Sequence, residues 1–113
     1  MKRRGPNPPA HLSDPSKTWW RSVVTDFALE PHHLNLLRLA CEAWDRCQQA
    51  REAIGKDGIT IKDDRGNLRA HPAVAIEKDS RIAVARLIRE LDLDTEPPAN
   101  SRVGPPSIRS NRR

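Results

Sequence analysis

The residues of this chain best suited to a chemical role are basic side chains gathered near its two ends. They are Lys2, Arg3 and Arg4 at one end, and Arg102, Arg109, Arg112 and Arg113 at the other. Residues 5–101 hold 13 basic and 15 acidic residues, so the net charge of +5 comes from the ends. Lys and Arg neutralise phosphates and release counterions, so this distribution predicts basic tails that bind DNA. The alternative is tails that only keep a small protein soluble.

A second group of polar side chains follows Pro31. His32, His33, Asn35 and Arg38 are residue types that contact base edges or phosphates, and the helix predicted here could form a helix-turn-helix with the one before it. Asn35 and Arg38 are therefore candidate DNA contacts. Recognition helices are normally shorter than this one, so the alternative is the solvated face of an assembly helix.

The sequence predicts no catalytic site, no metal and no cofactor. His32 and His33 are adjacent, so on a helix they point in different directions, and no Cys or carboxylate stands three or four residues further on. Gly accounts for only 5 of 113 residues, and neither a Gly-x-Ser-x-Gly motif nor a phosphate-binding glycine loop occurs. These observations favour a binding protein over an enzyme.

Residues 1–12 are the first element that must position these side chains. Pro6, Pro8 and Pro9 predict an extended basic arm, because proline removes backbone donors and disfavours helix at the preceding residue. A first helix is predicted to begin at residues 13–15, where Ser13 can act as the cap. Its apolar stripe consists of Trp19, Trp20, Val23, Val24 and Phe27. Tryptophans in such a stripe indicate core packing, with stacking on single-stranded bases as the alternative.

The second predicted helix opens at residues 30–31, runs to Ile54 and is closed by Gly55, which can adopt a left-handed conformation. At roughly 24 residues and ~1.5 Å per residue it is longer than a monomer of this size needs, which predicts a partner subunit. Cys41 and Cys47 fall on different faces and are expected to stay reduced. The expected buried face is Leu36, Leu37, Ala40, Cys41, Ala43, Trp44, Cys47, Ala50 and Ile54.

Two short strands, 58–62 and 66–69, are predicted on either side of a turn at residues 63–65. An isolated hairpin is only marginally stable, so it is expected to pack on a helix or pair with a neighbour. A third helix is predicted over residues 71–91. Its apolar residues are Ile76, Ala83, Val84, Leu87, Ile88 and Leu91.

The expected fold is mainly α, a helical hairpin plus a third helix with a small β-hairpin insert and flexible basic tails. The domain is expected to span residues 13–94, with the arm at 1–12 and a disordered basic tail at 95–113, which is rich in Pro, Ser, Asn and Arg. No run of about 18 apolar residues could span a membrane, and the N-terminus leads into Gly and Pro rather than a signal-peptide segment. A cytosolic protein is therefore expected.

The order of these features resembles the P27-type small terminase subunits of tailed phages over roughly residues 5–92. The family often ends its last helix in Leu-Gly-Leu-Thr-Pro, whereas this chain has Leu91-Asp92-Leu93-Asp94-Thr95 before Pro97-Pro98. Each matching motif is common alone, so their order and spacing carry the resemblance. In chain order they are Arg3-Arg4-Gly5-Pro6, Pro9-Ala10-His11-Leu12-Ser13, Trp20, Leu36-Leu37-Arg38-Leu39-Ala40-Cys41-Glu42-Ala43, Asp57-Gly58-Ile59-Thr60, Asp64-Arg65-Gly66 and His71-Pro72-Ala73.

The resemblance implies the small subunit of a phage terminase. Such a subunit is a non-catalytic homo-oligomer, usually a ring, that binds double-stranded viral DNA at the packaging start and regulates the ATPase and nuclease of the terminase large subunit. The expected location is the host cytoplasm, outside the mature virion and without a membrane partner. A dimeric helix-turn-helix transcriptional regulator and a protein-only assembly scaffold are the alternatives.

Overall fold

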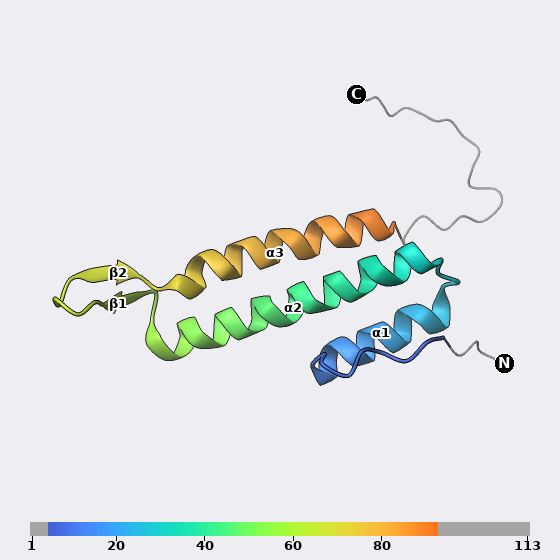
Figure 1. Ribbon diagram of the computed structural model, residues 1–113, viewed down its shortest axis with the longest axis horizontal. Helices are drawn as coiled ribbons and strands as arrows, with labels where there is room; N and C mark the ends of the chain where they lie inside the picture. The colour runs from blue at the N-terminus through green and yellow to red at the C-terminus, as the bar shows by residue number, and fades with distance from the viewer. Residues whose placement is uncertain (1–4, 93–113) are drawn as a thin grey trace, which may run out of the picture.

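In the computed structural model, which describes residues 5–92, three helices and one two-stranded antiparallel sheet follow one another along the chain. The elements are α1 (Asp14–Asp26), α2 (Pro31–Asp57), β1 (Thr60–Lys62), β2 (Leu68–Ala70) and α3 (Pro72–Leu91). Figure 1 shows α2 and α3 side by side, α1 on the other side of α2, and the β-hairpin projecting beyond the helices. The predicted mainly α fold with a β-hairpin insert is confirmed.

Local sequence determines where the helices begin, because each has a proline in its first turn. Proline suits this position since its fixed φ is helical and its missing N–H would have had no partner. Ser13 caps α1 by accepting a hydrogen bond from the amide of Ser16 at 3.3 Å. Nδ1 of His71 caps α3 by accepting one from the amide of Ala73 at 3.0 Å. These contacts confirm the predicted starts of α1 and α3.

The predicted end of α2 at Gly55 was wrong. Nothing lies within 4 Å of the position that a Cβ at Gly55 would take, and the helix continues through this residue to Asp57. It ends at Gly58, which has a φ of 86° and whose amide donates to the carbonyl of Ile54 at 2.7 Å. Glycine can also serve as an ordinary helical residue, so only the one that adopts positive φ ends the helix.

The chain departs from the family pattern at the end of α3, where an aspartate stands in place of a glycine. Asp92 has a left-handed φ of 55°, and its amide donates to the carbonyls of Ile88 and Arg89. It stands where the family pattern Leu-Gly-Leu has glycine. Aspartate adopts this conformation more readily than most residues other than glycine, so the helix can end in the same way.

The β-hairpin pairs Thr60 with Ala70 and Lys62 with Leu68, so its second strand lies slightly later than predicted. The cause is the turn: the Asp63 side chain accepts hydrogen bonds from the amides of Arg65 and Asn67, both at 2.9 Å, so the turn extends to Asn67, which had been assigned to the strand. No helix among residues 5–92 covers the hairpin, and Ile59 and Leu68 remain about two-thirds exposed.

The core lies where α1, the first half of α2 and the end of α3 meet. Between α2 and α3 the buried side chains are small, which lets the two helices approach closely. Both cysteines are buried and free, as expected. The main buried cluster consists of Leu12, Trp20, Val23, Val24, Leu37, Cys41 and Leu91.

Several residues expected in the core are exposed instead. Phe27 follows the end of α1, and Trp44 on α2 is 43% exposed. On α3, Ile76 and Ile88 are also exposed. The prediction from apolar stripes overestimated burial, because α2 is covered by α1 on one side and by α3 on another. The residues between these two contacts remain exposed to solvent.

Candidate functional site

Both ends of the described chain lie at the same end of the molecule (Figure 1). Gly5 packs against Val24 near the end of α1, and Leu91, the last residue of α3, lies in the same core cluster as Val24. The first turns of α2 are here too, and this region is termed the tail end. The seven terminal basic residues predicted to contact DNA lie outside the described residues: Lys2, Arg3, Arg4, Arg102, Arg109, Arg112 and Arg113.

The N-terminal arm is packed on α1. A Cβ at Gly5 would lie 2.6 Å from the Cβ of Val24, so only glycine permits this approach. Nε1 of Trp20 donates a hydrogen bond to the carbonyl of Pro6 at 2.8 Å, and Leu12 is buried in the core. Residues 5–12 are therefore part of the packed structure, and Gly5, which follows the basic residues in the sequence, is held at the tail end.

Asn35 and Arg38, the two candidate DNA contacts on α2, are exposed at the tail end. Nη1 of Arg38 lies 3.8 Å from Oε2 of Glu42, which also contacts Nε2 of His11 at 2.7 Å. A long, solvated ion pair contributes little stability, so Arg38 can exchange Glu42 for a phosphate at little cost.

The packing of α1 on α2 does not match the helix-turn-helix considered from the sequence. Ser16, near the start of α1, donates to Asp45 in the middle of α2 at 2.6 Å, whereas Val24, near the end of α1, clusters with Leu37 near the start of α2. The two helices therefore run antiparallel, side by side, rather than crossing at ~90–120°. They form a helical hairpin.

Asp45 fixes α1 to α2, a role that the sequence analysis missed. Its carboxylate accepts hydrogen bonds from the Ser13 amide at 2.8 Å, the Ser13 hydroxyl at 2.5 Å and the Ser16 hydroxyl at 2.6 Å. Burial raises the pKa of Asp45, but the hydrogen bonds from Ser13 and Ser16 outweigh it and hold the pKa below its usual value. The ionised carboxylate thus stabilises the start of α1.

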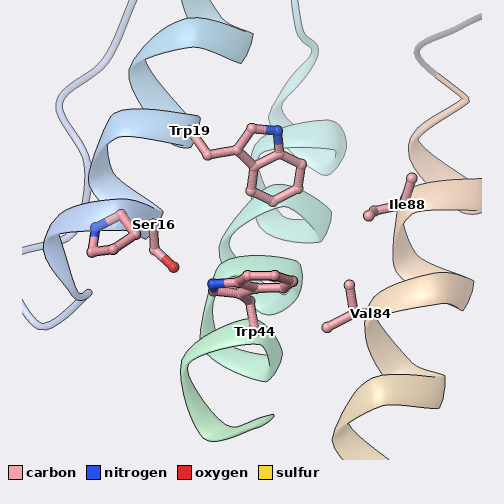
Figure 2. Close-up of a pocket in the computed structure, with 6 residues that line it drawn as sticks. Ser16, Trp19, Trp44, Val84 and Ile88 are labelled. Carbon is pink, nitrogen blue, oxygen red and sulfur yellow. The ribbon is translucent and has the colours of Figure 1, made fainter. Parts of the chain in front are cut away.

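An apolar groove opens between α1 and α3, with α2 beneath it. Figure 2 shows Trp44 of α2 between Ser16 and Trp19 of α1 on one side and Val84 and Ile88 of α3 on the other. The groove, termed the Trp44 groove, has a volume of about 310 Å³. It is lined by Pro15, Ser16, Trp19, Trp44, Val84 and Ile88.

Arg86 and Arg89 are further candidate phosphate contacts that the sequence analysis did not single out. Both are exposed on the last two turns of α3, at the tail end, and neither forms an ion pair with any residue in the range 5–92. For Arg89 the signal was present, because Lys78, Ile82, Ala85 and Arg89 follow the spacing i, i+4, i+7, i+11 of one helix face that carries no acid. Arg89 also suits the negative end of the helix dipole.

Further from the tail end, Glu77 of α3 forms one ion pair with Arg51 of α2 and a second with Arg81 of α3 itself. Oε2 of Glu77 lies 3.1 Å from Nε of Arg51 and 3.2 Å from Nε of Arg81. Hydrogen bonds from Arg81 and then Arg51 hold the pKa of Glu77 below its usual value. These charges are engaged within the protein, so they suit a structural role.

The described part of the chain holds no group of three or more His, Cys, Asp and Glu residues arranged to bind a metal ion. His32 and His33 stack on each other, with ring centroids 4.1 Å apart. None of the helices in this part is both long and apolar enough to cross a bilayer.

One known family matches the chain. Its sequence model, described as phage terminase, small subunit, aligns with residues 16–107, a span that runs from α1 through α3 and beyond. No curated protein and no solved structure matches. Because the family match covers well over half of the sequence, the chain belongs to the phage terminase small-subunit family.

Proposed function

We propose that this chain is a P27-type small terminase subunit that has no catalysis of its own. Copies of it form a ring in the host cytoplasm, bind double-stranded viral DNA at the packaging start and regulate the ATPase and nuclease of the large subunit. The observation that carries the proposal is that the described chain begins and ends at the tail end of the helices, and the sequence carries seven basic residues before and after it.

Charge at the tail end supports DNA binding. Asn35, Arg38, Arg86 and Arg89 are exposed on α2 and α3 in the region where the described chain begins and ends, and the sequence continues from there into seven terminal basic residues. Each phosphate contact by Lys or Arg releases counterions, and assembly multiplies the contacts through effective concentration. Exposed side chains on rigid helices would fix the position of the protein along the duplex, while the tails would follow the phosphate backbone.

Assembly is supported by apolar surface away from the tail end. Ile59 and Leu68 of the β-hairpin are about two-thirds exposed, and a two-stranded sheet without a covering helix is only marginally stable alone. A neighbouring copy would supply the missing cover. Light scattering should show a closed oligomer for the wild type and a smaller mass for the variant Ile59→Ser with Leu68→Ser.

DNA binding is tested by the fluorescence anisotropy of a labelled duplex at several salt concentrations. Each lost phosphate contact lowers the log–log salt slope by about 0.9, so replacing Lys2, Arg3 and Arg4 by Ser should lower it by up to about 2.7 for each subunit that contacts the duplex. The matched control, Lys56→Ser with Lys62→Ser and Arg65→Ser, removes three charges far from the tail end. The control should keep the wild-type slope.

Equal losses in the two variants would show a response to net charge alone and would overturn the assignment of DNA binding to the tail end. A wild-type oligomer that does not bind DNA at low salt would point to the protein-only scaffold instead. Regulation is measured separately, as the ATPase rate of the purified large subunit with and without this chain and viral DNA.

A further inference from the structure

The Trp44 groove is an open apolar surface with an unusual lining. Trp44 is 43% exposed and Ile88 45% exposed, although both stand on helices that are otherwise packed against each other. The indole N–H groups of Trp19 and Trp44 have no hydrogen-bond partner among residues 5–92, whereas that of Trp20 is satisfied by Pro6. The groove therefore has apolar walls, and the two tryptophans that line it carry indole N–H groups without partners among the described residues.

This combination fits one class of ligand well. Proline-rich segments in an extended polyproline conformation dock in aromatic-lined grooves, where their rings pack on indoles. Their backbone carbonyls are free to accept hydrogen bonds, because the polyproline helix has none of its own. The volume of about 310 Å³ is at the lower end of the roughly 300–1,000 Å³ typical of ligand sites, which suits a few prolines.

The sequence carries such a segment after the end of α3. Pro97-Pro98 and Pro105-Pro106 follow the end of α3, and Ile88, which lines the groove, lies only three residues before Leu91. The family match extends to residue 107 and includes both proline pairs. We propose that residues 96–108 of the same chain dock in the Trp44 groove.

The length of chain is sufficient for this docking. Residues 92–96, five residues at up to ~3.3 Å each, span about 16 Å, while Val84 lies seven residues before Leu91, about 10 Å along the helix axis. The left-handed conformation of Asp92 turns the chain away from the helix axis at the start of this path. The groove also supplies the apolar contacts that the composition of the segment lacks.

Docking would fix where the C-terminal basic residues begin. Arg102 lies between the two proline pairs and would be held against the helices, while Arg109, Arg112 and Arg113 would extend beyond the groove. The inference does not depend on the proposed DNA-binding function, because docking is measured without DNA.

The test follows the indole N–H signals of the full chain by two-dimensional ¹H–¹⁵N NMR. The chain has three tryptophans and so gives three such signals. A variant with Ser in place of all four prolines should shift the Trp19 and Trp44 signals and speed their hydrogen exchange at least tenfold, while Trp20 stays unchanged. The substitutions lie outside the described helices, and a control with Ser110→Ala and Asn111→Ala, which lie beyond the docking segment, should leave all three signals in place.

Two results would overturn the proposal. One is an identical set of indole signals in the wild type and the proline variant. The other is a wild-type pattern that reverts to that of the proline variant on dilution to monomer, which would identify the occupant as a second copy. A synthetic peptide of residues 95–109 added to the proline variant should restore the wild-type shifts if the docking is direct.

Discussion

Removal of the Asp45 carboxylate should detach the start of α1 from α2. The substitution Asp45→Ala deletes the acceptor of three hydrogen bonds and leaves the Ser16 hydroxyl, 1% exposed as a residue, with only a 3.4 Å contact to the Cys41 carbonyl. Hydrogen bonds to a charged group contribute about 1.5–3 kcal/mol each when buried, and Asp45 is partly solvated. We therefore expect a total loss of about 2–3 kcal/mol, and about 1 kcal/mol for Asp45→Asn, which keeps one acceptor oxygen.

The measurement is urea unfolding at pH 7 followed by circular dichroism, with Glu52→Ala as the control. Glu52 is an exposed carboxylate on the same helix without a partner among residues 5–92, so its removal should change stability by less than about 0.5 kcal/mol.

Because the pKa of Asp45 is lower in the folded than in the unfolded chain, the contribution of Asp45 to the free energy of unfolding is complete above the unfolded pKa of about 4. The wild type and Asp45→Ala should therefore converge as the pH falls below about 4. Equal losses for Glu52→Ala and Asp45→Ala, or a difference that persists at pH 2, would refute the reasoning.

Three further predictions concern the glycines and the thiols. Gly55→Ala should raise the free energy of unfolding by about 0.5–1 kcal/mol, because Gly55 is helical and the new methyl group meets open space; an unchanged or lower urea midpoint would contradict this. Gly5→Ala should cost about 1–3 kcal/mol, because its methyl group would meet Val24 at 2.6 Å, and should increase acrylamide quenching of tryptophan as the arm leaves α1. Burial, together with two nearby carboxylates, raises the pKa of the Cys41 thiol to about 12, so in a Cys47→Ser background its labelling at pH 8 should be roughly 1,000-fold slower in the native than in the unfolded chain. Comparable labelling rates would show that the core opens readily.

Helix starts could be predicted from the sequence because their causes are local. Ser13 and His71 cap their helices within the next three residues, and a proline follows each of them closely. The end of α2 was harder to predict, because either Gly55 or Gly58 could end the helix. Only the backbone conformation shows that Gly58 does so. Local pattern therefore gave the elements and most of their boundaries.

The candidate sites depended on contacts between residues distant in sequence. The hydrogen bonds of Asp45 to Ser13 and Ser16 span about 30 residues, and the contact of Gly5 with Val24 depends on how the arm folds back. The exposure of Trp44 follows from which sides of α2 the other helices cover, and a periodic apolar pattern carries no such information. The basic tails could be identified from the charge distribution. Only the fold shows that the described chain begins and ends at the same end of the helices.

The shared position of the two chain ends also determines how the molecule bears a mechanical load. If the tails hold DNA, a pull on that DNA enters the protein at Gly5 and Leu91, both at the tail end. A force that pulls these two points apart would separate α3 from the other helices starting at the tail end, rather than shear the whole α2–α3 contact at once. If a neighbouring copy holds the β-hairpin at the opposite end, the same pull is transmitted along α2 and α3 to that contact, so the length of the α2–α3 pair would carry the load between DNA and neighbour.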